Sequence, residues 1–68
     1  MLRIAKLRSE KGISQAKLAR IADVNASSLN RIENGKEPLY PVRGRRIADA
    51  LGWNGDPDAL LEEVGRDE

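Results

Sequence analysis

Apolar residues recur along this chain at the three- and four-residue spacing of amphipathic helices. We expect five helices, over residues 2–11, 15–22, 26–34 and 41–51 and from Asp56–Pro57 onward. Short breaks separate the first four, and two of these breaks contain a glycine, Gly12 or Gly35. The pattern predicts an all-α fold, a compact bundle of five short helices that forms one domain over residues 1–68.

Residues suited to helix ends flank these segments. Ser14 and Asn25 are good N-caps for the second and third helices, because their short side chains accept hydrogen bonds from the first free N–H groups. Pro41 suits the first turn of the fourth helix. The inward apolar positions predict a core made of Leu18, Val24, Leu29, Ile32, Ile47, Leu51 and Trp53.

Composition removes several classes of function. The 68 residues include neither cysteine nor histidine, so the usual metal ligands and the commonest general base are absent. We therefore expect no enzyme activity, no cofactor and no bound metal. No apolar run reaches the roughly 20 residues of a membrane span, and no signal peptide is visible. We expect a cytoplasmic protein with no membrane partner.

The net charge of +1 conceals an uneven distribution. Residues 1–53 carry eleven Lys and Arg against five Asp and Glu, a net charge of +6. Residues 54–68 carry one Arg against six acids, a net charge of −5. The basic body suits contact with a polyanion while the acidic tail points away, although acids at a helix N-terminus such as Asp56 are also ordinary.

The second and third helices predict a helix-turn-helix over about residues 14–35. Only about three residues separate the two helices, and so tight a break makes them cross steeply. With Leu29 and Ile32 facing inward, helical geometry places a polar set on the opposite face. That set is Ser27, Asn30, Arg31 and Asn34. It can read the edges of DNA bases, or it can be a plain solvated face.

Three stretches resemble the phage-repressor and Cro type (XRE-like) of helix-turn-helix family. They are ISQAKLA at 13–19, VN at 24–25 and LNRIENGK at 29–36. IADALG at 47–52 looks like the fourth helix of that family, and the likeness covers roughly residues 2–64. The resemblance implies a sequence-specific regulator of transcription, and a repressor in particular. It would bind a double-stranded DNA operator, an inverted repeat, with residues 26–34 in the major groove.

The resemblance also implies roles for individual residues. Positions that match base contacts of the family are Ala26, Ser27 and Arg31. Arg31 can chelate guanine, and Ala26 can pack on a thymine methyl group. Positions that match phosphate contacts are Gln15, Asn25, Asn34 and Lys36. Glu33 is expected to be structural and to hold a nearby basic side chain or backbone group, since an acid facing phosphates would repel them.

The chain departs from the family pattern at three places. Asp23 stands where the turn often has glycine, which requires a left-handed backbone that aspartate tolerates. Ser27 and Ser28 are small where relatives often carry glutamine, which leaves the target sequence open. The run from Arg43 to Arg46 has Gly44 inside a predicted helix. We expect Arg43 to contact phosphate there, with insertion of Arg-Gly-Arg into the minor groove as the alternative.

Other functions remain open at this point. The fold also serves as the antitoxin of a toxin–antitoxin pair, in which case the chain would have a toxin partner, and a plain structural bundle is a further alternative. One recognition helix covers only a few base pairs, so we expect a homodimer on DNA. Its contact would use the apolar stripe of the fifth helix, which consists of Leu60, Leu61 and Val64.

Overall fold

A computed structural model describes residues 1–65 and confirms the all-α fold. Its elements are α1 (Arg3–Glu10), α2 (Gln15–Ala22), α3 (Ala26–Glu33), α4 (Pro41–Leu51) and the 3₁₀ helix η1 (Pro57–Leu61). Residues 1–65 contain no β strand, although an isolated antiparallel bridge joins Leu2 to Glu63. No helix within this part of the chain is long and apolar enough to cross a membrane.

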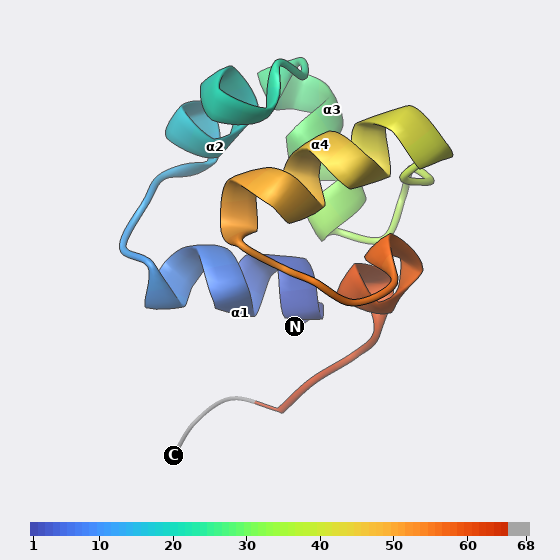
Figure 1. Ribbon diagram of the computed structural model, residues 1–68. Helices are drawn as coiled ribbons and strands as arrows, with labels where there is room; N and C mark the ends of the chain where they lie inside the picture. The colour runs from blue at the N-terminus through green and yellow to red at the C-terminus, as the bar shows by residue number, and fades with distance from the viewer. Residues whose placement is uncertain (66–68) are drawn as a thin grey trace.

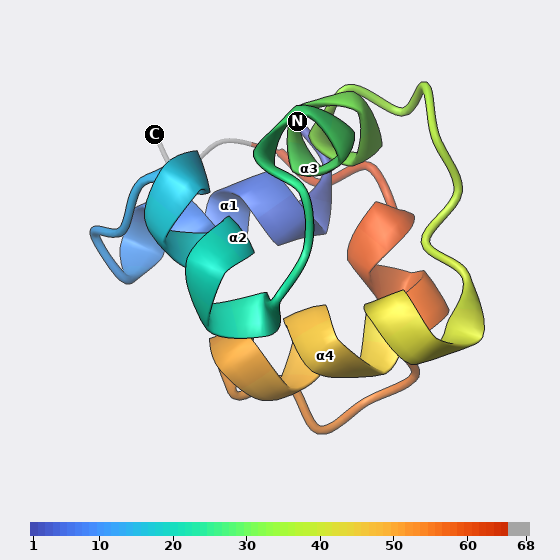
Figure 2. The ribbon, with the colours of Figure 1, turned by 90° about the horizontal axis from the view of Figure 1, so that it is seen from above.

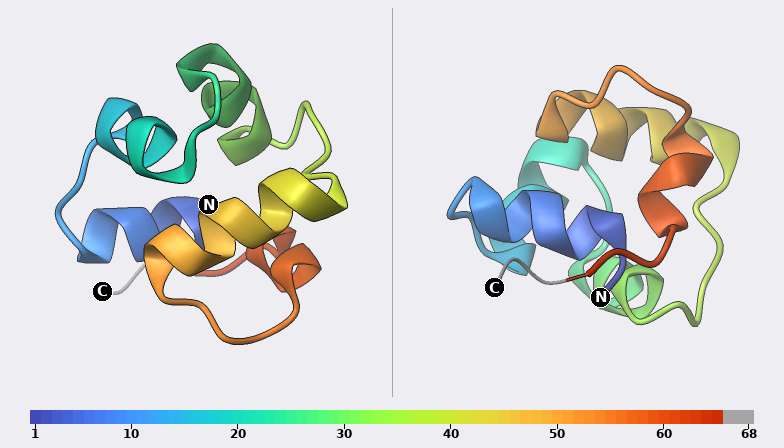
Figure 3. Two further views of the ribbon diagram at one scale, coloured as in Figure 1. Left: turned by 45° about the horizontal axis from the view of Figure 1, so that its top comes forward. Right: turned by 90° about the horizontal axis from the view of Figure 1, so that it is seen from below.

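The helices pack around a single core. In Figure 1, α2 and α3 lie together at the top, α4 crosses in front, and α1 and η1 lie below. Figure 2 shows from above that the end of α2 lies against α4, and the right view of Figure 3 shows η1 between α4 and the start of α1. In agreement, α2 packs against both α3 and α4, while η1 packs against α4 and α1. α3 is thus supported from one side by α2.

The predicted core is largely confirmed. The fully buried large side chains are Ile4, Leu18, Leu29, Ile32, Ile47 and Leu60, and Leu51 is only 3% exposed. Val24 and Trp53, which the pattern also predicts as core, are half-buried and pack at its edge. Leu39 is 2% exposed even though the sequence places it in a polar loop. The periodicity of helices gives no information about a single apolar anchor within a loop, so Leu39 escapes prediction.

The fifth helix differs from its prediction. It is a 3₁₀ helix of five residues, started by Asp56, whose Oδ1 accepts a hydrogen bond from the Asp58 N–H at 2.9 Å. Because Leu60 is 0% exposed, it is not available for the dimer contact that the sequence assigns to Leu60, Leu61 and Val64. The short η1 packs against α1 and α4, so its apolar side chains close the core of their own chain first.

Gly44 lies inside α4 because another segment approaches it closely. A Cβ atom at this position would lie 3.2 Å from Cβ of Pro57 and 3.7 Å from Cβ of Leu39. Glycine in a helix interior costs about 1 kcal/mol relative to alanine, and close packing of η1 and the preceding loop onto α4 offsets that cost. This packing accounts for the glycine without any contact to the minor groove.

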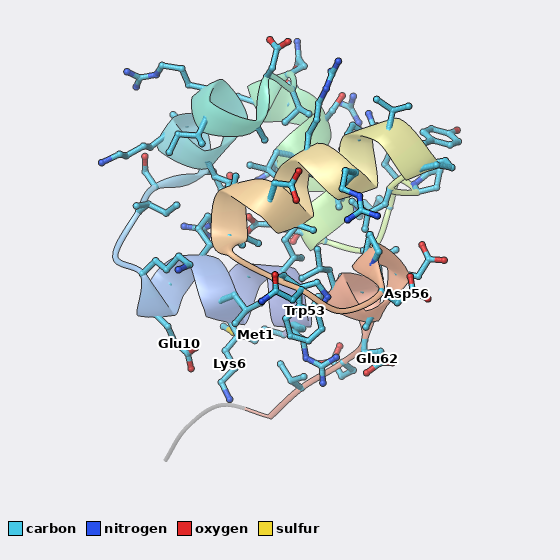
Figure 4. All side chains as sticks on the ribbon, viewed as in Figure 1. Met1, Lys6, Glu10, Trp53, Asp56 and Glu62 are labelled. Carbon is cyan, nitrogen blue, oxygen red and sulfur yellow. The ribbon has the colours of Figure 1, made fainter. Side chains whose placement is uncertain are left out.

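The N-terminal residues are held by the segment that follows η1. The Arg3 N–H donates to the Glu62 carbonyl at 2.9 Å, and the Val64 N–H donates to the Met1 carbonyl at 2.8 Å. The Arg3 side chain donates to the Ala59 carbonyl at 2.9 Å and stacks over the Trp53 ring. Figure 4 shows Met1, Trp53 and Glu62 on the side of the molecule away from α2 and α3.

Replacing Leu29 by alanine tests the assignment of the inner face of α3. Leu29 is fully buried, so Leu29→Ala should lower the free energy of unfolding by about 2–5 kcal/mol through lost contacts and a residual cavity. Ile21 is 54% exposed on α2, so Ile21→Ala should change it by about 0.5 kcal/mol or less. Urea unfolding followed by circular dichroism measures both variants, and equal losses would contradict the assignment.

Candidate nucleic-acid interface

The turn between α2 and α3 sets the direction of the second helix. Asp23 has φ 57° and ψ 49°, which confirms the left-handed conformation predicted for it. The next residue, Val24, donates its N–H to the Ala19 carbonyl at 2.9 Å, closing the end of α2. The chain therefore changes direction within residues 23–25, and α3 packs across α2.

Asn25 fixes the first turn of α3. Its Oδ1 accepts hydrogen bonds from the N–H groups of Ser27 at 2.8 Å and Ser28 at 3.3 Å, which confirms the predicted cap. The cap satisfies donors that an uncapped helix start leaves open. The cap uses the oxygen of the amide, so the Nδ2 group is the part of Asn25 that remains suited to donate to a phosphate.

α3 has one buried and one exposed face. Leu29 and Ile32 lie in the core, and Glu33 joins them on the inner side. The opposite face carries five exposed residues, which are Ala26, Ser27, Asn30, Arg31 and Asn34. Only Ala26 among these lacks a polar side chain, so the exposed face can make hydrogen bonds along its whole length.

A buried carboxylate joins the first three helices. The Glu33 side chain is 4% exposed and accepts from Arg8 Nε at 2.8 Å and from Arg8 Nη2 at 3.1 Å. A third donor, Gln15 Nε2, lies 2.9 Å from the same carboxylate. Arg8 also donates from Nη1 to the Ile13 carbonyl at 2.9 Å. The structural role expected for Glu33 is confirmed, and its basic partner is Arg8, which the sequence pattern does not reveal.

Gln15 connects this buried pair to the exposed face of α3. While its Nε2 donates to Glu33, its Oε1 accepts from Asn30 Nδ2 at 3.1 Å. Asn34 Nδ2 then donates to the Asn30 carbonyl at 2.9 Å and to Asn30 Oδ1 at 3.2 Å. Hydrogen bonds thus connect the amides of Gln15, Asn30 and Asn34 in one row, so these side chains are oriented before any DNA is bound. The contact of Gln15 and Asn34 with phosphate stays a prediction.

Arg31 is paired with an acid from the loop that follows α3. Its Nε donates to Glu37 Oε1 at 2.7 Å, and its Nη2 donates to Ser28 Oγ at 3.3 Å. The Arg31 side chain remains 51% exposed. The hydrogen bond from Arg31 holds the pKa of Glu37 below its usual value, against the effect of partial burial and with help from the charges of Arg31 and Arg43.

The Arg43 side chain, on α4, binds the loop of residues 34–40 and does not project into solvent. Its Nη1 lies 2.8 Å from Glu37 Oε2, its Nη2 donates to the Pro38 carbonyl at 2.6 Å, and its Nε donates to the Leu39 carbonyl at 3.1 Å. Each guanidinium nitrogen thus has a partner within the protein. A contact of Arg43 with phosphate, as the sequence predicts, would compete with these bonds. Lys36 is exposed at the start of the same loop.

Sequence reasoning misses the two residues that support this surface, Arg8 and Glu37. Glu37 follows Arg31 by six residues and precedes Arg43 by six, which is no regular helical spacing. Only the path of residues 34–40 brings the three side chains together. Within residues 1–65, no group of three or more acidic side chains is arranged to hold a metal ion.

Comparison with known proteins identifies the family. The family described as "Helix-turn-helix domain" matches residues 2–66, and the chain belongs to that family. The HTH-type transcriptional regulator RamB of Mycobacterium tuberculosis, in strains CDC 1551 / Oshkosh and ATCC 25618 / H37Rv, is 40% identical over 50 residues. The match covers 74% of this chain, which spans about 10% of the length of these curated relatives. No solved structure matches the chain significantly.

The Arg8–Glu33 pair should be a main determinant of stability. In Glu33→Gln the guanidinium of Arg8 loses its counter-charge in a site where the carboxylate is 4% exposed, so the free energy of unfolding should fall by about 3 kcal/mol. The matched change Glu62→Gln removes the acid of the Arg3–Glu62 pair, in which Glu62 is 62% exposed, and should cost about 1 kcal/mol or less. Urea unfolding at pH 7 compares them. Losses of equal size would show that burial of Glu33 contributes nothing.

Proposed function

We propose that this chain binds double-stranded DNA in a sequence-specific manner, with α3 in the major groove, as the DNA-binding part of a transcriptional regulator. The observation that carries the proposal is the division of α3 into two faces. Leu29, Ile32 and Glu33 fix the inner face in the protein, while a polar face stands exposed and presents Arg31 at its centre. Membership of the helix-turn-helix family and the name of the RamB relatives support the same function.

The contacts divide into two sets by position. Ala26, Ser27 and Arg31 lie on the exposed face of α3, where side chains reach base edges. Those proposed for phosphate lie at or just beyond the ends of α2 and α3 and are Gln15, Asn25, Asn34 and Lys36. Contacts to phosphate fix the register of the helix on the duplex, while contacts to bases give the specificity.

The proposed active form on DNA is a homodimer. One α3 spans too few base pairs for useful specificity, whereas two copies on neighbouring major grooves would lie about 34 Å apart. Burial of Leu60 leaves Leu61 and Val64, both partly exposed, for a contact between copies. Repression, the direction implied by the phage-repressor resemblance, would follow from occupation of an operator.

Selection from a pool of random oligonucleotides tests the function directly. The protein should enrich one sequence, arranged as an inverted repeat whose half-sites are about 10 base pairs apart. Ser27→Ala in parallel should alter the enriched sequence and keep the spacing, since Ser27 is proposed to contact bases only. A pool that shows no enrichment after repeated rounds would refute sequence-specific binding, and an enriched site without symmetry would refute the dimer.

Arg31→Ala distinguishes a base contact from a phosphate contact. If Arg31 reads guanine, the variant should lose about 1–3 kcal/mol of binding free energy on the selected operator and relax the preference at one base pair per half-site. Random DNA should lose much less. Competition binding at one fixed salt concentration measures both losses.

Lys36→Ala is the matched control for that experiment, because it also removes one exposed positive charge next to α3. It should weaken operator and random DNA about equally and reduce the salt slope by about one unit. An Arg31→Ala variant that behaves like Lys36→Ala would remove Arg31 from the residues that read bases.

A further inference from the structure

We propose that Glu37 is a positioning residue that directs Arg31 to a base edge and away from phosphate. The proposal rests on the function proposed above and concerns how selectively the same surface reads DNA. It starts from one contact, the 2.7 Å hydrogen bond from Arg31 Nε to Glu37 Oε1. An acid beside a DNA-binding face repels phosphate, so its presence there needs a role that outweighs the loss of attraction.

Glu37 binds the Nε atom of Arg31, so the end of the guanidinium that carries Nη1 and Nη2 stays open for a base. Guanine presents two acceptors, O6 and N7, which suit a pair of parallel N–H donors. With Nε held by Glu37, the Nη1 and Nη2 groups form the outward fork. Nη2 makes a 3.3 Å hydrogen bond to Ser28 Oγ, a longer bond than the one to Glu37 and an easier one to exchange for a base.

Glu37 can orient Arg31 because Glu37 is itself held on its other side. Its Oε2 lies 2.8 Å from Arg43 Nη1, and Arg43 is bound to the carbonyls of Pro38 and Leu39. Leu39 is 2% exposed and belongs to the core cluster. A continuous series of bonded groups therefore runs from the core through Arg43 and Glu37 to Arg31. A side chain that is ordered before binding loses less conformational freedom on the DNA.

The carboxylate of Glu37 also changes how strongly Arg31 prefers a base over a phosphate. A free guanidinium binds any phosphate, in any sequence, as a mobile positive charge. The Glu37 carboxylate offsets part of the positive field around Arg31, so the attraction of Arg31 to the backbone falls while its hydrogen-bond geometry is kept. Glu37 therefore lowers binding to random DNA and makes the remaining interaction of Arg31 depend on the base it meets.

Two substitutions of Glu37 separate orientation from charge. Glu37→Gln removes the charge and weakens the hold on Nε, whereas Glu37→Asp keeps the charge and withdraws the carboxylate from Arg31. Glu10→Gln is the control for net charge, because Glu10 is exposed on α1 and lies at the lower edge of the molecule in Figure 4, away from α3. Thermal melting by circular dichroism establishes the temperature at which each variant is folded.

Each variant is titrated with the selected operator, with an operator changed at the guanine that Arg31→Ala ceases to read, and with random DNA. Discrimination at that guanine should fall about tenfold in both Glu37 variants and stay unchanged in Glu10→Gln. Binding of random DNA should rise severalfold in Glu37→Gln alone. In the Arg31→Ala background, Glu37→Gln should cause no further loss of discrimination. In the free protein, the NMR signal of the Arg31 Nε–H should shift in both variants.

Several results would overturn the proposal. If Glu37→Asp keeps full discrimination, or if Glu37→Gln strengthens operator and random DNA by the same factor, Glu37 acts only through its charge. If Glu37→Gln lowers discrimination further when Arg31 is already alanine, Glu37 does not act through Arg31. If the unaltered protein shows no preference for any sequence, the proposed function fails and this inference fails with it. If the unaltered protein selects a sequence but discrimination at that guanine stays unchanged in both Glu37 variants, the inference alone is overturned.

Discussion

The carboxylate of Glu33 must be neutralised inside the protein, and this requirement fixes the position of α3. Apolar contacts resist separation of helices but tolerate sliding, whereas a buried charge accepts partners only at defined distances and angles. Glu33 takes two bonds from Arg8 on α1 and one from Gln15 on α2. Sliding of α3 along α2 would break these bonds and leave a charge buried without a partner. A core with few large side chains thereby acquires one defined geometry.

The uneven charge of the chain has a structural use at the opposite end of the molecule. Glu62 pairs with the Arg3 side chain at 2.7 Å, and Glu63 pairs with the N-terminal amine of Met1 at 2.7 Å. These acids close the base of the bundle, where η1 and the start of α1 meet. The negative charge of residues 54–65 is therefore held away from α2 and α3.

Local chemistry made most of the fold predictable. Ser14, Asn25 and Asp56 cap the helices that follow them, and Asp23 takes the left-handed conformation that its place in the turn requires. What escaped prediction depends on contacts between distant parts of the chain. A sequence pattern cannot show that Gln15 turns its amide to Glu33, because 18 residues separate them. Leu39, Arg43 and the acid Glu37 likewise gain their roles only when the loop folds back on α4.

Two arginine–carboxylate pairs include a residue of α3, and they differ in how far their side chains are exposed to water. Arg8 and Glu33 are 20% and 4% exposed, so their attraction is little screened and separation would leave the Glu33 carboxylate buried without a partner. Arg31 and Glu37 are 51% and 19% exposed, so their attraction is screened and the outer nitrogens of Arg31 remain accessible. Replacing Arg8 would therefore disturb the fold, whereas Arg31 is exposed enough to be replaced without loss of the core. Depth of burial thus assigns Arg8 to the architecture and leaves Arg31 accessible for the recognition proposed for it.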